Sequence, residues 1–343
     1  MRPYFITFSL LTLALIFSVG LGSVYIAPLE VIRILLSRLP LIQLTPDWQE
    51  TSEIILFNIR LPRTLLIALT GAALGGSGAA YQGLFRNPLA DPYLIGIASG
   101  AGLGAVIAMS IEFPTTLLGL FTVPIAAFVG ALITVAFVYN IARVGKSAHV
   151  TTLILAGVAV GSFATALTTF LMLRSQEQLR RAIGWLLGGF ALGGWLPVVA
   201  LLPYIIIGLT VLILFARPLN VLQFGDDQAE QLGLNVERVK MIVIVAASLT
   251  TAAAVAFSGI IGFVGLVTPH VIRLVWGTRL SPPAPALDHR GRRHAAPHRH
   301  RRPHRYRAAR VAARRRHRPH RRTVFFISVA EGETRNVLVI SEK

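Results

Sequence analysis

Two short glycine-containing motifs are the places where this sequence could bind a nucleotide. Gly145-Lys146-Ser147 resembles the end of a phosphate-binding loop, but that loop needs a glycine five residues before Gly145, and the residue there is Asn140. Gly100-Ala101-Gly102-Leu103-Gly104-Ala105 fits the loose GxGxxA dinucleotide pattern, yet no strand precedes it and no acidic residue follows at the required distance. Close helix packing explains these glycines better, so we predict that the chain binds no nucleotide or other cofactor.

The remaining reactive side chains form no recognisable catalytic or metal-binding pattern. Cysteine is absent, which excludes disulfides and thiolate metal sites. His270 follows Pro269 near the end of an apolar run, and a lone histidine is more often a structural hydrogen-bonding group than a ligand. No serine is paired with a histidine as a nucleophile is with its base. We therefore predict that the chain is not an enzyme and holds no metal.

The elements available to position any site are apolar helices. The chain is 54% hydrophobic with a mean hydropathy of +0.65, which is too apolar for an ordinary soluble domain. Runs of membrane-spanning character lie at residues 5–19, 64–81, 93–109, 117–140, 150–173, 195–216, 238–257 and 262–277. We predict an all-α, polytopic membrane bundle over residues 1–279 with about eight spans. A cleaved signal peptide, the alternative for the first run, lacks a clear cleavage site.

The cores of these spans contain no Asp, Glu, Lys or Arg. Proton pumps and ion-coupled secondary transporters usually carry such groups inside the membrane as relays. An ion-coupled secondary transporter is therefore the alternative that the sequence disfavours, and the energy for any transport must come from other subunits.

The second span and the segment after it have a distinctive composition. Small residues fill its second half, including Gly71, Gly75 and Gly78, which lets neighbouring helices approach closely. Asn87-Pro88-Leu89-Ala90-Asp91-Pro92 follows, and its two prolines each remove a backbone donor and disfavour helical geometry in the residue before them. We predict an interior helix followed by a fixed, non-helical elbow.

Several of these segments together resemble the FecCD-type permeases, the membrane subunits of ATP-driven importers for iron-siderophores, haem and cobalamin. The resemblance rests on Arg60-Leu61-Pro62-Arg63, the run from Gly71 to Gly78, Gln82, Arg86-Asn87-Pro88-Leu89-Ala90, the run from Gly96 to Ala101, and the run from Phe257 to His270 with Arg273-Leu274. It implies a type II ABC importer permease with ten spans in the bacterial inner membrane, surrounded by membrane lipid. It also implies that the chain forms a dimer with a second copy or a close homologue, and that the substrate path lies on the dimer axis. The implied partners are two ABC ATPase subunits and a periplasmic or lipid-anchored substrate-binding protein.

The same resemblance implies roles for individual residues. Arg60 and Arg63 would pair with acidic residues of the substrate-binding protein, although arginines there could simply anchor the span at the interface. The sequence Ala229-Glu230-Gln231-Leu232-Gly233 matches the coupling helices that dock on the ATPase, where the alternative is a solvated loop. The fifth span would line the substrate path, with Ser147, His149, Thr151 and Thr152 in its cytoplasmic gate. Residues 174–194 resemble the family's short external helix, and the cargo implied is an iron-siderophore or related metal chelate.

The C-terminal block, residues 280–343, has a different chemistry. Residues 281–322 contain 15 arginines and one Asp, which account for 14 of the formal net charge of +18. Such a segment lacks the apolar surface needed to fold, although the family has two further spans here. We infer a frameshift, because CGN arginine codons read one base later become GNN codons for small or acidic residues.

The alternatives are a basic tail for anionic lipid or nucleic acid, or a histidine-rich metal-binding tract. Only Tyr306 accompanies the arginines as an aromatic residue within this tract, which makes nucleic acid a poor candidate partner.

Overall fold

The computed structural model describes residues 2–38, 46–111, 116–144, 147–174, 176–189 and 193–276, all within one unit, Met1–Pro285. The predicted tail, residues 280–343, and the domain boundary at residue 279 lie outside the described residues. Both stay predictions.

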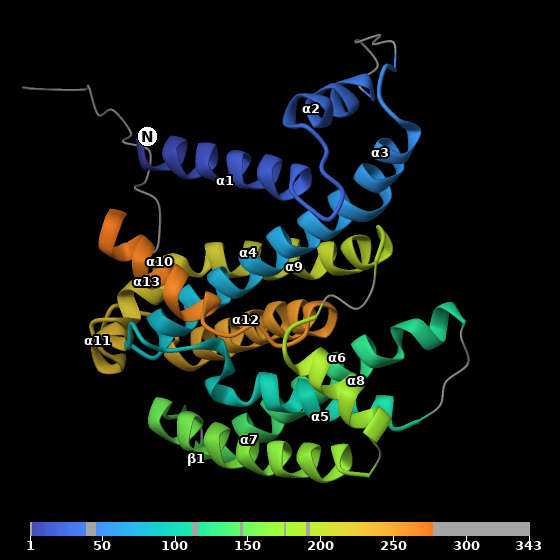
Figure 1. Ribbon diagram of the computed structural model, residues 1–343. Coiled ribbons are helices and arrows are strands. Elements are labelled where there is room, and N and C mark those ends of the chain that lie inside the picture. The colour runs from blue at the N-terminus through green and yellow to red at the C-terminus, as the bar shows by residue number, and fades with distance from the viewer. Residues whose placement is uncertain are drawn as a thin grey trace, which may run out of the picture. The chain divides into compact units, whose positions relative to one another are not determined.

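The described residues are almost entirely helical (Figure 1). The α-helices are α1 (Arg2–Gly20), α2 (Pro28–Ser37), α3 (Glu50–Ile54), α4 (Leu61–Leu84), α5 (Ile97–Met109), α6 (Leu117–Ala142), α7 (Val150–Met172), α8 (Gln176–Leu186), α9 (Leu196–Leu214), α10 (Ala216–Leu222), α11 (Asp226–Gln231), α12 (Val236–Ser258) and α13 (Val264–Trp276). A π-helical turn, η1 (Ile55–Arg60), and a 3-10 turn, η2 (Pro92–Ile95), complete them. Two short strands, β1 (Arg143–Val144) and β2 (Ser147–Ala148), pair antiparallel, with Arg143 opposite Ala148.

All eight predicted spans are helices, which confirms the all-α membrane bundle. Five helical stretches are long and apolar enough to cross a bilayer: Glu50–Leu84, Gly119–Ala142, Val150–Met172, Leu196–Leu214 and Val236–Ser258. Shorter apolar helices, Phe5–Gly20, Ile97–Met109 and Val264–Val275, coincide with the other three predicted spans. The count of eight crossings therefore stays a prediction.

Residues 26–60 are of mixed polarity and include several prolines, so the sequence predicts an external loop with one short amphipathic helix around residues 29–39. The structure differs from that loop. The short amphipathic helix predicted around residues 29–39 is present as α2, with Val31 and Ile34 buried. However, α3, η1 and α4 follow one another without a break, so the helix of the second span begins at Glu50. Pro62 lies in this helix, and the widened turn of η1 just before it accommodates a residue that lacks a backbone donor. The extension was missed because the prediction followed the charge-free run, residues 64–81, and the segment before that run contains charged residues and prolines.

Helix α12 is the centre of the bundle. It packs against α4 and α9 and against α5 and α6 (Figure 1). In its most apolar stretch 72% of the residues are buried, against 33% or less for the other four long helices. Alanines and small hydroxyl residues on α12 permit this close packing, and Tyr81 of α4 hydrogen-bonds Ser248 of α12 over 2.7 Å. Movements of α12 would therefore affect most of the bundle.

The elbow after α4 is fixed by side-chain hydrogen bonds. Asn87 accepts from the Leu89 amide over 2.9 Å, and Asp91 accepts from the Tyr93 amide over 2.8 Å. Gln82 donates to the carbonyls of Ala90, over 3.2 Å, and Leu266, over 3.0 Å, and so joins the elbow to α13. Gly96 then joins η2 to α5, and its φ of 84° suits a glycine.

Candidate functional site

A short exposed helix, α11, lies between α10 and α12 at one end of the bundle. It contains most of the predicted coupling sequence. Ala229 is its buried residue, while Glu230, Gln231, Leu232 and Gly233 are exposed. The chain enters and leaves this helix through Gly225 and Gly233, whose φ values are 120° and 83°.

Large apolar side chains flank the exposed face of α11. Leu232 is 71% exposed and Phe224, just before Gly225, is 70% exposed. Asp227 and Glu230 lie between them in the sequence and are exposed as well. This combination of two apolar anchors and acidic neighbours can bind a protein groove with an apolar floor and basic rim. Phe224 was not predicted, although an exposed aromatic residue beside a glycine could have suggested it.

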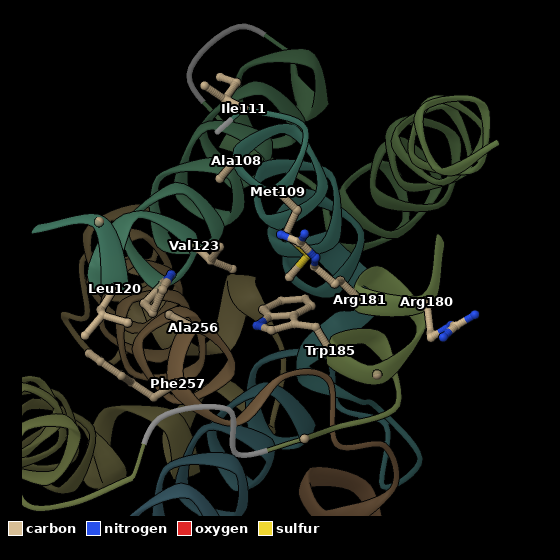
Figure 2. A pocket seen from close by; sticks show the side chains of 14 residues that line it. Ala108, Met109, Ile111, Leu120, Val123, Arg180, Arg181, Trp185, Ala256 and Phe257 are labelled. Atoms are coloured by element: carbon tan, nitrogen blue, oxygen red, sulfur yellow. The ribbon is translucent and has the colours of Figure 1, made fainter. Parts of the chain in front are cut away.

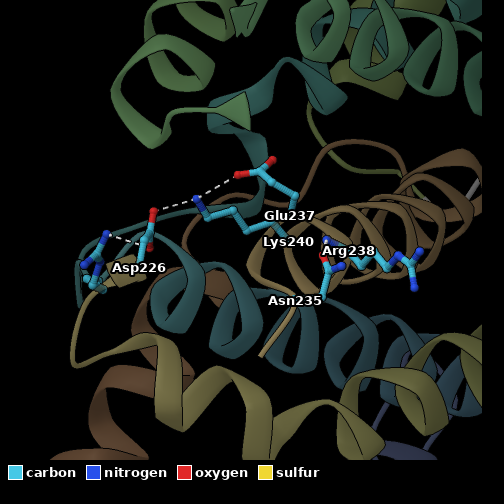
Figure 3. Close-up of polar contacts among 6 residues, drawn as sticks. Asp226, Asn235, Glu237, Arg238 and Lys240 are labelled. Atoms are coloured by element: carbon cyan, nitrogen blue, oxygen red, sulfur yellow. Dashed lines mark hydrogen bonds and ion pairs between the residues drawn. The ribbon is translucent and has the colours of Figure 1, made fainter. Parts of the chain in front are cut away.

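An ion-pair network anchors the beginning of α11 (Figure 3). Asp226 Oδ2 lies 2.7 Å from Lys240 Nζ of α12, and Asp226 Oδ1 lies 3.2 Å from an Arg86 guanidinium nitrogen at the end of α4. Lys240 also lies 3.4 Å from Glu237 Oε1. The Lys240 side chain is only 5% exposed, so this cation depends on its two carboxylates. Sequence analysis did not predict the network, because its members come from three separate segments.

The outer face of α7 forms the second candidate site. Ser162, Thr165 and Thr169 line a cavity of about 770 Å³ together with Asp91 and Tyr93 of the elbow region. These hydroxyl residues recur at helical spacing, and small residues such as Gly157 and Gly161 lie beside them on α7. Burial raises the pKa of the Asp91 carboxyl, an effect that its hydrogen bond from the Tyr93 amide partly opposes. The wall is mostly apolar, and these hydroxyl groups are a polar row along it where a solute could bind as it passes.

The predicted gate residues lie at the start of α7, away from that cavity. Ser147 belongs to β2, His149 precedes the helix and is exposed, and Thr151 and Thr152 lie in the first turn. Lys146 and the side chain of Ser147 lie outside the described residues. Their assignment to a gate stays a prediction.

The two predicted docking arginines have different surroundings. Arg60 donates to the carbonyls of Val19 and Gly20 over 2.9 Å each, and also to the Val24 carbonyl. Arg63 is exposed, and within the part of the chain that the structure describes its side chain has no ion pair or hydrogen bond. Arg60 is therefore hydrogen-bonded within the chain, whereas Arg63 is available to a partner.

The predicted packing glycines also differ from one another. A Cβ at Gly78 would lie 1.8 Å from the Gly265 carbonyl oxygen of α13, whereas one at Gly75 would make an ordinary 3.8 Å contact with Thr268. At Gly71 no atom lies within 4 Å of that position, so this glycine makes no close helix contact among the described residues. Gly100 and Gly104, from the rejected dinucleotide pattern, lie against α6, which confirms that close packing explains them.

An apolar cavity of about 630 Å³ lies between α5, α6, α8 and the end of α12 (Figure 2). Trp185 and Met109 face its interior, Arg181 reaches over it, and Arg180 points away. Arg181 also pairs with Glu177 on the same helix. Among the described residues, no group of three His, Cys, Asp or Glu side chains could hold a metal ion.

Comparison with known proteins places this arrangement in a family. The profile of the FecCD transport family matches residues 10–287. The chain is 42% identical over 276 residues to the ABC transporter permease protein YvrB of Bacillus subtilis, covering 80% of this chain and 78% of that protein. It is 46% identical over 228 residues to the cobalamin import system permease protein BtuC of Halobacterium salinarum, covering 66% and 61% respectively. A solved structure described as an inward-facing, metal-chelate type ABC transporter superposes with a TM-score of 0.69 at 29% identity, over 81% of this chain and 83% of that one.

Proposed function

The chain belongs to the FecCD transport family, and from that premise we propose that it is the permease subunit of an ABC importer for an iron-siderophore or related metal chelate. It lies in the bacterial inner membrane as a multi-pass protein. The family match over residues 10–287 is the observation that carries the proposal. Relatives named for cobalamin, haemin and iron(III) citrate import support a metal-chelate cargo.

Two copies of the chain, or one copy and a close homologue, would form the passage. The hydroxyl-lined face of α7 supports this arrangement, because Ser162, Thr165 and Thr169 remain uncovered within one copy. Facing helices from two copies would enclose a polar path between them. The His149 to Thr152 segment at the start of α7 would then form the cytoplasmic gate.

Two ABC ATPase subunits would dock on α11 and supply the energy. The exposed Phe224 and Leu232 beside acidic residues support this role, since apolar anchors at the centre of a contact contribute most to binding. Ala229 keeps α11 seated on the bundle, whereas Glu230 to Gly233 remain accessible. A substrate-binding protein would dock at the opposite end, with Arg63 available to its acidic residues.

Reconstitution tests the proposal. The chain is placed in proteoliposomes with the ATPase and binding protein encoded beside its gene, and uptake of a ferric siderophore, haem, cobalamin and iron(III) citrate is followed with and without ATP. We expect uptake of one of these that requires ATP and disappears with a hydrolysis-deficient ATPase. Uptake by the chain alone, driven by a proton or sodium gradient, would overturn the proposal in favour of a secondary transporter.

A paired substitution separates docking from folding. Leu232→Asp should reduce ATPase co-purification at least about tenfold, because it places a charge in an apolar contact. Leu173→Asp is the matched control, since Leu173 is 74% exposed at the far end of α7. Equal loss in both variants would show that α11 has no special role in docking.

A further inference from the structure

Helix α11 is weakly attached to the rest of the protein by apolar contacts. Ala229 is its buried residue, and the glycines on either side adopt positive φ values. Glycines permit large changes of backbone conformation. The peptide connections at these glycines are therefore flexible. If they were the only attachment, a displacement of α11 would change the conformation of the glycines and would not move the rest of the bundle.

Asp226 provides a connection of that kind to two other helices. Its two carboxylate oxygens bind different partners: Oδ2 binds Lys240 over 2.7 Å, and Oδ1 binds Arg86 over 3.2 Å. Lys240 lies one turn inside α12, and Arg86 follows α4 directly before the elbow. One side chain thus joins α11 to the central helix and to the helix that carries the elbow.

The two ion pairs of Asp226, one with Lys240 and one with Arg86, differ in strength; we call them the arms to α12 and to α4. The Lys240 side chain is 5% exposed and the Asp226 side chain 35%, so solvent screens their pairing only in part. Arg86 is 40% exposed, and exposed ion pairs usually contribute little. Two cations, Arg86 and Lys240, and two carboxylates, Asp226 and Glu237, balance one another within the network (Figure 3). The arm to α12 is therefore the stronger one.

We propose that Asp226 is a positioning residue that holds α11 on α12 through Lys240, so that displacement of α11 moves the centre of the bundle. Arg86 forms a weaker second arm to the end of α4. This inference rests on the proposed function, because it names the link through which the ATPase would act. Phe224 and Leu232 bind the partner, and Asp226 transmits the movement.

The positioning is testable on the full chain alone. Because the chain has no cysteine, spin labels can be introduced at Gln228→Cys and Val245→Cys, exposed positions on α11 and α12, without removing native thiols. We expect a narrow label-to-label distance distribution that broadens with Asp226→Asn and changes less with Arg86→Gln. Asp227→Asn is the matched control, since Asp227 is an exposed neighbour without an ion pair among the described residues. An unchanged distribution in Asp226→Asn would overturn the inference.

Transmission is tested in the reconstituted importer. Asp226→Asn should raise the ATP hydrolysed per substrate imported by up to about tenfold, the order expected for a close, partly buried charge pair, while Asp227→Asn should change it less than about twofold. An unchanged ratio in Asp226→Asn would contradict transmission through this residue. Absence of ATP-dependent uptake both in the unsubstituted chain and in a version whose reading frame is restored after residue 279 would contradict the proposed function, and the distance measurement would still decide whether Asp226 positions α11.

Discussion

At the scale of single residues, Arg60 and Arg63 illustrate how neighbours of one type acquire different roles. The carbonyls that Arg60 contacts belong to the end of α1 and the turn after it, where helix carbonyls lack intrahelical partners. A cation there also interacts favourably with the negative end of the helix. Arg60 therefore holds α1 against the start of α4, whereas Arg63 is free to meet another protein.

Substitutions at these two positions should separate stability from docking. Arg60→Ala should lower the thermal unfolding temperature in detergent, because up to three carbonyls lose a charged donor at roughly 1–3 kcal/mol each. Arg60→Lys should restore only part of this, since an ammonium cannot reproduce the guanidinium fork. Arg63→Ala should leave the unfolding temperature unchanged and weaken binding-protein affinity in titrations. A stability loss confined to Arg63→Ala would contradict this division.

Asp91 caps the turn η2 with a carboxylate that is partly removed from water. It accepts the Tyr93 amide at the start of η2, and burial raises its carboxyl pKa above the usual value. An acid whose pKa is raised by folding binds its proton more tightly in the folded state than in the unfolded state. The free energy of unfolding therefore falls as the pH rises from the unfolded-state pKa through the folded-state pKa. Asn can form the same cap without a charge.

We therefore expect Asp91→Asn to be at least as stable as the unsubstituted protein at neutral pH, and to lose part of the pH dependence that begins as the pH rises above about 4, the ordinary pKa of an aspartate. Asp91→Ala should be less stable than Asp91→Asn at every pH by about 1 kcal/mol, because both lack the charge and only alanine also lacks the cap. Thermal unfolding across this pH range measures both. A neutral-pH destabilisation by Asn equal to that by Ala would show that the charge itself is needed.

At the scale of elements, contacts between backbones set how the helices cross. Gly78 of α4 lies against Gly265 of α13, and a Cβ on Gly265 would in turn meet the Leu74 carbonyl oxygen at 3.0 Å. Helices that approach this closely exclude every side chain larger than hydrogen. The crossing holds the elbow in place, since Pro92 also lies beside Gly265.

Gly78→Ala should consequently destabilise the protein by at least about 1–3 kcal/mol, the usual range for overpacking. Gly71→Ala is the matched control on the same helix, with open space around the new methyl group. It should be neutral or stabilising by up to about 1 kcal/mol, because alanine favours helix more than glycine does. Thermal unfolding in detergent measures both, and equal effects would contradict the packing argument.

At the scale of the whole molecule, the exposed face of α7 predicts a second copy. Thr165 is exposed on that face, while Thr168, three residues on, is buried against the rest of the chain. With no native cysteine, Thr165→Cys should form an intermolecular disulfide in oxidised membranes and Thr168→Cys should not. Gel mobility without reductant measures this. Cross-linking of Thr168→Cys alone would place the dimer contact elsewhere.

The C-terminal block gives a prediction at the level of the gene. Residues 316–324, read one base later with permitted codons, can spell Val-Thr-Ala-Leu-Ile-Gly-Ala-Pro-Phe, which resembles the opening of the family's last span. Resequencing the coding DNA around residue 280 should reveal an insertion or deletion, and the restored frame should add two apolar spans. A confirmed, intact reading frame would refute the frameshift and leave a basic tail to be explained.

Much of the fold was predictable because its causes are local. Long apolar runs define helices wherever they occur in the chain, and the two prolines define the elbow, since both effects depend on neighbouring residues only. The motif residues 60–63, 71–78 and 86–90 likewise indicated the family, which the profile match confirms. The start of the second helix at Glu50 was missed, because residues 50–63 contain four charged residues and a proline, whereas the helix continues through them by way of the widened turn η1.

The sequence by itself determined that this is a helical membrane protein, because the hydrophobicity of its long apolar runs is a property of composition. Only the tertiary structure decided that Arg60 holds α1, that Gly78 and not Gly71 lies at a helix crossing, and that Asp226 joins Lys240 and Arg86. Those pairings join residues 14 to 187 positions apart, and which of them meet depends on how the helices pack around α12.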